Sequence, residues 1–228
     1  ETRLKIIRDE PIGEYSWDYK SDGTYNNDWS TSTLKDLLNE GGAYYERTIG
    51  SYYNRSSMPI TVDFAEIGLT NNAKEMISDA IWNLGAGADI NYNGTSVVKE
   101  WYDQERSNRA YNNRWTEWTG KIGLMYPSDY GYATSGGSAG RDICLATALQ
   151  NWAETNCYSN DWLYNHIFFW TLTSYFNSSS AFTIGASGFT WGEQCDAVYN
   201  VKPTTYLKSM TKIISGSGTK EQPYILEL

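Results

Sequence analysis

Three short apolar segments in the last third of the chain constrain the fold more than any other feature. Residues 168–172, 181–184 and 201–207 are rich in aromatic and β-branched side chains, as strands usually are. Polar, turn-forming residues separate the first two segments, and the connection to the third opens with Gly185 and Gly188. Because such connections are typical of hairpins, the chain is expected to end in an antiparallel sheet.

Two segments in the first half of the chain have the periodicity of helices. Ser30 or Ser32 can cap a short leucine-containing helix that ends at Gly41–Gly42. Apolar residues then recur at helical spacing over 70–84, behind the cap Thr70. The sequence therefore predicts two early helices.

Further strands are expected at residues 4–8 and 119–126. The first strand is expected to pair with the last one, at 201–207, which brings the two ends of the chain close together. No repeat, linker or low-complexity tract divides the sequence. We expect one domain over 1–228, α+β in class, with a mainly antiparallel sheet.

Cys144 and Cys157 lie in a long connection, 127–165, that has little periodicity. Long irregular connections are usually functional or held by cross-links. A disulfide between these two cysteines fits a composition rich in Asn, Ser, Thr, Tyr and Gly, which favours an exported protein. It leaves Cys195 unpaired. Three free thiols in a cytosolic protein are the alternative, and the sequence leaves it open.

Charge and the rarity of histidine exclude several classes of function. The chain has 18 Lys and Arg against 27 Asp and Glu, a net charge of −9, which argues against nucleic acid as a partner. One histidine and no C-x-x-C pair leave no ordinary zinc site, and no metal or cofactor is expected. No apolar run approaches the ~18 residues of a membrane span, so no membrane contact by this domain is expected. The chain begins at Glu1 without a signal peptide, and we expect that an anchoring N-terminal helix has been removed.

Aromatic side chains are unusually frequent, with 19 Tyr, 10 Trp and 6 Phe. A core can bury most of these rings, and the remainder suits binding surfaces, where Tyr and Trp make rigid contacts. The two late connections supply a candidate ligand-binding set: Tyr175, Phe176, Asn177, Phe189, Trp191, Glu193, Gln194, Tyr199 and Asn200. Cys195 lies inside this set and is hard to explain as a core residue. A second cluster of tyrosine pairs lies at 44–45 and 52–53. The alternative is that Phe189 and Trp191 cap the core beside solvated turns.

One pattern belongs to hydrolases. Gly136–Gly140 satisfies G-x-S-x-G, and Asp161 and His166 follow Ser138 in the order of a catalytic triad. The segment before Ser138 is short for the strand that such a nucleophile needs, and Gly/Ser loops produce the pattern by chance. A secreted serine hydrolase using Ser138 is therefore an alternative, and our expectation is that the chain is not an enzyme.

Weaker patterns each have a simpler explanation. A cysteine–histidine pair would need Cys195 beside His166, and 215–220 resembles a phosphate loop only superficially and suits a turn. Acidic residues near aromatic ones could form a sugar-cleaving pair, and oxygens near the N-terminus could hold Ca²⁺, but neither set has the spacing of a known site. These residues are Glu66, Asp129 and Asp161 for the first set, and Asp18, Asp22, Asn26, Asn27 and Asp28 for the second.

Five segments together resemble a bacterial surface domain found in proteins that begin with a prepilin-type methylated helix. The segments are Trp118–Ala133, Asn160–Tyr164, Phe169–Leu172, Val201–Lys208 and Gly216–Ile225. The stretch from Trp170 to Leu207 is also similar to the end of bacterial C-type-lectin-like domains, with Lys202 in place of an arginine.

These resemblances imply a non-catalytic, extracellular domain with a C-type-lectin-like fold, displayed on a bacterial surface or a type IV pilus. Its expected work is adhesion or ligand binding, with a host protein or a glycan as the ligand and filament or surface proteins as partners. A structural filament subunit without a ligand is the alternative.

Overall fold

The computed structural model has the α+β fold that the sequence predicts. It describes residues 3–20, 22–39, 43–45, 59–61, 64–85, 96–138, 140–219 and 221–228. Among these residues, no helix is long and apolar enough to cross a membrane.

The largest sheet has five strands in the order β10–β9–β8–β11–β2. Their bounds are Thr190–Gln194, Ser180–Ile184, Phe169–Ser174, Val198–Asn200 and Glu14–Ser16. The predicted strands at 168–172 and 181–184 are confirmed as the central hairpin β8–β9, and only the β11–β8 pair is parallel. The second late connection holds two strands, β10 and β11, that the sequence did not reveal. The glycine and charged residues of this connection weaken the strand pattern in the sequence. In the structure, β10 is stabilised by pairing with β9, and β11 by pairing with β2.

A three-stranded sheet joins the first strand to a late one. Strand β1 (Lys5–Ile7) pairs antiparallel with β12 (Pro203–Tyr206), which confirms the predicted pairing of the 4–8 and 201–207 segments. The second of these segments is not the last strand, because two more strands follow it in the chain. Strand β7 (Ile122–Leu124) lies on the other side of β12. The single strand expected at 119–126 is divided in two, because β6 (Glu117–Gly120) pairs with a different partner, β5 (Ala80–Asn83).

The prediction of a helix over 70–84 is correct for its first half and wrong for its second half. Thr70 caps helix α3 (Asn71–Met76), its hydroxyl accepting the Ala73 N–H at 3.2 Å, as predicted. The helix ends at Met76, and the chain continues as β5, in which Trp82 is buried and Ile81 is 61 % exposed. Alternating burial and the ladder to β6 therefore replace the second half of the helix.

Other helices follow local capping signals. Ser32 accepts the Lys35 N–H at 3.2 Å at the start of α1 (Thr33–Asn39), which confirms the first predicted helix. A 3₁₀ turn, η1 (Trp29–Thr31), precedes it. The remaining elements before residue 120 are β3 (Ala43–Tyr45), β4 (Pro59–Thr61), α2 (Phe64–Ile67), α4 (Val98–Glu105) and η2 (Tyr111–Asn113).

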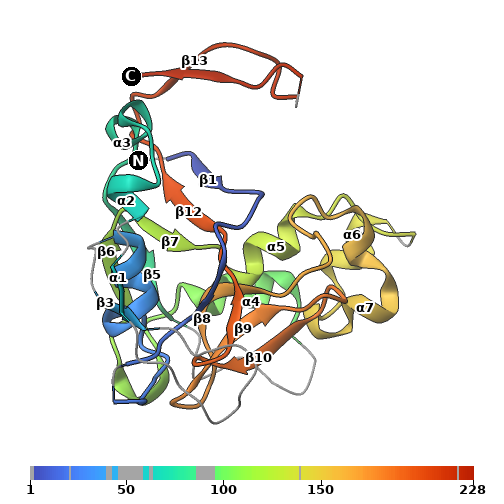
Figure 1. Ribbon diagram of the computed structural model, residues 1–228. Coiled ribbons are helices and arrows are strands. Elements are labelled where there is room, and N and C mark those ends of the chain that lie inside the picture. The colour runs from blue at the N-terminus through green and yellow to red at the C-terminus, as the bar shows by residue number, and fades with distance from the viewer. Residues whose placement is uncertain are drawn as a thin grey trace.

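The long connection 127–165 consists of short helices rather than irregular chain. They are α5 (Pro127–Ala133), α6 (Arg141–Leu145), η3 (Leu149–Asn151), α7 (Trp152–Thr155) and η4 (Cys157–Asn160). The Cys144–Cys157 disulfide is present, with the two Cα atoms 5.5 Å apart, and it ties α6 to η4. Figure 1 shows α5, α6 and α7 grouped on one side of the molecule, with α1 and α2 on the other. Each helix is too short to produce a readable periodicity.

The core takes up a large share of the tryptophans. Six tryptophans are buried: Trp17, Trp29, Trp82, Trp101, Trp152 and Trp170. They belong to two clusters, one around α1 and β7 and the other around α4, α5 and α7. Cys195 is fully buried in the first cluster, so the expectation that it would not fit a core is wrong.

Residues 160–164 and 201–208 are in contact. The ammonium of Lys202, which is buried just before β12, donates to the Leu163 carbonyl at 2.8 Å and lies 4.8 Å from the centre of the Phe169 ring. Burial lowers the pKa of Lys202. The nearby Asp161 carboxyl is also buried, which raises its pKa to about 7. The 160–164 and 201–208 segments therefore share one buried polar contact.

The C-terminal residues form a separate two-stranded ribbon, β13 (Lys212–Ser215) paired with β14 (Ile225–Glu227). Gly216 and Gly218, at φ +93° and +79°, make the turn, which confirms a turn rather than a phosphate loop at 215–219. Figure 1 shows the ribbon in red, projecting beyond the body of the molecule.

Candidate functional site

The predicted ligand-binding set divides between the core and the surface. Tyr175 is only 7 % exposed, and its ring packs 4.8 Å from Phe182. Asn200 donates its amide to the Phe168 carbonyl and serves the sheet. Tyr199 stacks on Phe168 at 5.2 Å. These three residues hold the fold together.

The surface part of the set lies along β10 and the connection before β9. Phe176 and Trp191 are 39 % and 44 % exposed, and the Phe189 ring lies 6.4 Å from that of Trp191. Partial burial raises the pKa of Glu193, and a hydrogen bond from Tyr199 acts in the opposite direction. Asn177 is half-buried and Gln194 is exposed. The second predicted cluster consists of the tyrosine pairs at 44–45 and 52–53. Residues 52–53 and the side chains of 44–45 lie outside the described residues.

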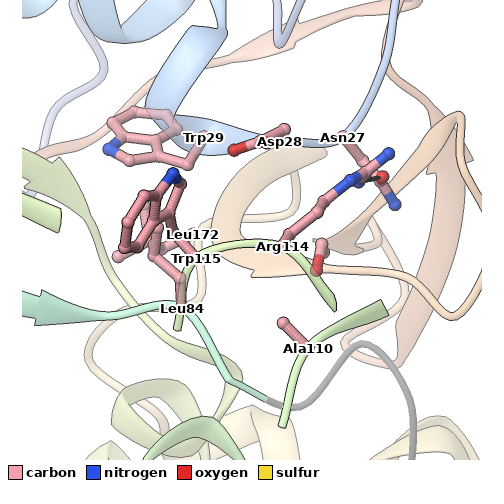
Figure 2. A pocket seen from close by; sticks show the side chains of 9 residues that line it. Asn27, Asp28, Trp29, Leu84, Ala110, Arg114, Trp115 and Leu172 are labelled. Atoms are coloured by element: carbon pink, nitrogen blue, oxygen red, sulfur yellow. Dashed lines mark hydrogen bonds between the residues drawn. The ribbon is translucent and has the colours of Figure 1, made fainter. Parts of the chain in front are cut away.

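A narrow cleft lies beside the 174–180 connection, and a loop from a distant part of the sequence forms its other wall. It is lined by Asn27, Asp28, Trp29, Leu84, Ala110, Arg114, Trp115, Leu172 and Ser174. Its enclosed part measures about 10 Å³, the space of a single water molecule. Figure 2 shows Arg114 extending toward Asn27, with Trp29 and Trp115 on the other side.

The cleft opens into a polar hollow of about 510 Å³ formed by residues 108–116. The two share Ala110, Arg114 and Trp115, so they form one continuous surface, which we name the Trp115 cleft. The Trp115 side chain is 74 % exposed, the highest value among the large hydrophobic residues described. An exposed indole beside a polar hollow is therefore the central feature of this surface.

Asn27 joins the two walls of the cleft. It is buried, and its amide nitrogen donates to the carbonyls of Tyr175, Asn177 and Ser180 at 3.0, 2.8 and 2.6 Å. Its carbonyl oxygen accepts a hydrogen bond from Arg114. Arg114 also donates directly to the Ser178 carbonyl at 3.5 Å, so its position depends on the turn between β8 and β9 through both contacts.

The loop that carries Trp115 has an unusual backbone and charge. Asn112 and Asn113 have φ of 54° and 55°, a left-handed conformation that asparagine tolerates better than most residues. Both side chains are exposed, as are Asn108 and Arg109. No acidic residue lies between Glu105 and Glu117, although the chain as a whole carries −9. The loop therefore presents amides, guanidinium groups and an indole to solvent.

The loop is rooted in the core by Glu105, the last residue of α4. The carboxylate accepts hydrogen bonds from the N–H and the hydroxyl of Ser128 and pairs with Arg106 at 3.1 Å. Complete burial raises the pKa of Glu105 to about 8, and the Ser128 hydrogen bonds act against this rise. Glu105, the residue directly before the loop, is thus fixed against α5.

The hydrolase pattern does not assemble. Ser138 lies on an exposed turn that follows helix α5, whereas the nucleophile of a G-x-S-x-G motif follows a strand. The Nδ1 atom of His166 bonds the Tyr164 hydroxyl at 3.1 Å, and no hydrogen bond to Ser138 is present in the described part of the chain. The Asp161 carboxylate accepts the N–H of Leu163. The described residues therefore do not connect Ser138, Asp161 and His166 by hydrogen bonds.

The other candidate residues have local structural roles. Cys195 is buried away from solvent, which raises the pKa of its thiol. Asp129 pairs with Lys5, and the side chain of Glu66 lies outside the described residues. Asp18 accepts the N–H groups of Asn26 and Thr33, Asp22 and Asp28 accept hydrogen bonds from their own turns, and Asn26 accepts the Asp28 N–H. Within the described ranges, no group of three or more His, Cys, Asp or Glu could hold a metal ion.

Sequence reasoning missed Trp115, Arg114 and the role of Asn27. The signal available was a single tryptophan in a stretch of asparagines and arginines without acids. In comparisons with known proteins, no family model, no curated protein and no solved structure matches the chain. The chemistry of the cleft therefore rests on its own residues.

Proposed function

We propose that this chain is a non-catalytic, extracellular ligand-binding domain of a bacterial surface or pilin-like protein, and that it binds a glycan at the Trp115 cleft. The observation that carries the proposal is the exposed Trp115 indole above a hollow lined by amide and guanidinium groups. The setting on a cell surface or pilus is supported by the prepilin-type resemblance and by the Cys144–Cys157 disulfide, which persists in oxidising compartments.

The residues of the cleft match the chemistry of a sugar ring. The apolar C–H face of a sugar can pack on an exposed indole, while its hydroxyls bond to donors and acceptors at the edge. Asn108, Asn112 and Asn113 provide both kinds of hydrogen-bonding group in one side chain. Arg109 and Arg114 add donors that favour an acidic sugar.

The cleft is preformed, which favours binding. Asn27 and its three carbonyl partners fix Arg114 before a ligand arrives, so less conformational entropy is lost on binding. The C-type-lectin-like fold remains part of this proposal and is supported by the similarity of the stretch from Trp170 to Leu207.

A glycan array followed by calorimetric titration of the best ligand tests the proposal. Trp115→Ala is expected to weaken binding about tenfold or more, because the stacking surface is lost. Trp162→Ala is the matched control, since this indole is 59 % exposed and lies outside the cleft. Wild-type affinity in Trp115→Ala would contradict the proposed site. The absence of any bound glycan would favour a host protein as ligand or a purely structural subunit.

A further inference from the structure

The C-terminal ribbon exposes apolar side chains. Ile213 and Ile214 are each 54 % exposed, at a point where the register of the ribbon shifts. The exposed apolar residues of the ribbon and its base are Met210, Ile213, Ile214, Tyr224, Ile225 and Leu228. An isolated two-stranded hairpin is marginally stable in water, so this ribbon requires a surface to cover it.

A matching depression lies on the body of the same molecule. It measures about 340 Å³ and is lined by Arg3, Asp79, Ala80, Ile81, Thr119 and Tyr206. Ile81, at the centre of strand β5, is 61 % exposed. We name this depression the Ile81 hollow. Its apolar centre is the kind of surface that an isoleucine-rich ribbon can cover.

The charges of the ribbon and of the hollow complement one another. Lys212 and Glu227 lie directly opposite each other in the ribbon, and neither forms an ion pair with a described residue. Arg3, on the edge of the hollow, is held by hydrogen bonds to the Ser78 hydroxyl and the Asp79 carbonyl. The Asp79 carboxylate is exposed and has no partner among the described residues. Within the described part of the chain, each surface thus offers one cation and one anion that form no ion pair.

We propose that the ribbon of one copy of this chain docks in the Ile81 hollow of a second copy. Lys212 then faces Asp79, Glu227 faces Arg3, and the isoleucines cover Ile81. The ribbon and the hollow are different surfaces, so the contact is head-to-tail, and each added copy leaves one ribbon and one hollow free. Such a contact builds an open chain of subunits unless its rotation closes a ring.

Sedimentation velocity over a range of concentrations tests this association with two single variants. Ile213→Lys destroys the ribbon surface and Ile81→Lys destroys the hollow, and both residues are exposed, so both variants are expected to fold. Each is expected to be monomeric where the wild type associates. A mixture is expected to form a one-to-one dimer that grows no further, because one intact ribbon meets one intact hollow. Ile143→Lys, on α6 and 56 % exposed, is the matched control and is expected to associate like the wild type.

Charge reversal tests the orientation. Lys212→Glu and Asp79→Lys are each expected to weaken association about tenfold, and the double variant is expected to recover most of the loss. A wild type that stays monomeric, a mixture that stays monomeric, or an Ile81→Lys variant that associates normally would each overturn the proposal. Trp115→Ala is expected to leave association unchanged, so this result is independent of the glycan-binding proposal.

Discussion

Two connections border the Trp115 cleft, and they use their aromatic residues in opposite ways. In the 174–180 connection, Tyr175 is buried and packs over Gly192, where a Cβ atom would lie 2.4 Å from its ring. In the 106–116 loop, Trp115 is 74 % exposed. Strand β10 packs against the Tyr175 ring through Gly192 and keeps it from solvent. Packing against a neighbouring strand, rather than the type of ring, therefore decides which aromatic residue is available to a ligand.

The largest expected effect separates these two rings by their contribution to stability. Tyr175→Ala removes a buried ring that contacts Phe182 and is expected to lower the free energy of unfolding by about 4 kcal/mol. Trp115→Ala is expected to change it by less than about 0.5 kcal/mol. Chemical denaturation of both variants measures the difference, and equal losses would refute the contrast between the two connections.

Local signals explain which parts of the fold could be predicted from the sequence. The caps Ser32 and Thr70 act on residues three positions away, so their helices begin where the pattern indicates. The disulfide was predicted from composition and from the spacing of two cysteines within one connection. Each of these features depends on neighbours that a short window of sequence contains.

Features that depend on distant partners could not be predicted. Strand β5 replaces half of the 70–84 helix because its partner, β6, lies more than 30 residues further along the chain. The same reason explains the site: Asn27 fixes Arg114, which is 87 residues away. The late connections were chosen for their aromatic content, and Ser174, which precedes Tyr175, does line the cleft, but nothing in the sequence relates it to residues 108–116.

Glu105, which fixes the start of the 106–116 loop, is expected to make the free energy of unfolding depend on pH. An unfolded Glu105 ionises near its ordinary pKa of 4.5, whereas in the fold burial raises the pKa to about 8. Between these values the folded state keeps a proton that the unfolded state has lost. The free energy of unfolding is therefore expected to fall by several kcal/mol as pH rises from about 4.5 to about 8, and then to level off.

Denaturation curves at several pH values for Glu105→Gln test this expectation. The amide stays neutral, so the decrease is expected to shrink to the part that comes from Asp161, whose pKa is raised to about 7, and from Asp18 and Glu193, whose pKa values are also raised. Glu117→Gln, an exposed residue at the other end of the loop, is the control and is expected to keep the wild-type slope. An unchanged slope in Glu105→Gln would show that this carboxyl does not hold the extra proton.

The smallest expected effect concerns the residue that couples the two connections. Asn27→Ala removes the hydrogen bonds to three carbonyls and to Arg114, at an expected cost of about 2 kcal/mol. Asn39→Ala is a matched control, because Asn39 bridges the Lys35 and Ile122 backbones away from the cleft. Amide hydrogen exchange over residues 108–116 is expected to accelerate in Asn27→Ala and to stay unchanged in Asn39→Ala. If both variants behave alike, Asn27 contributes to stability without positioning the loop, and the cleft is not preformed by this side chain.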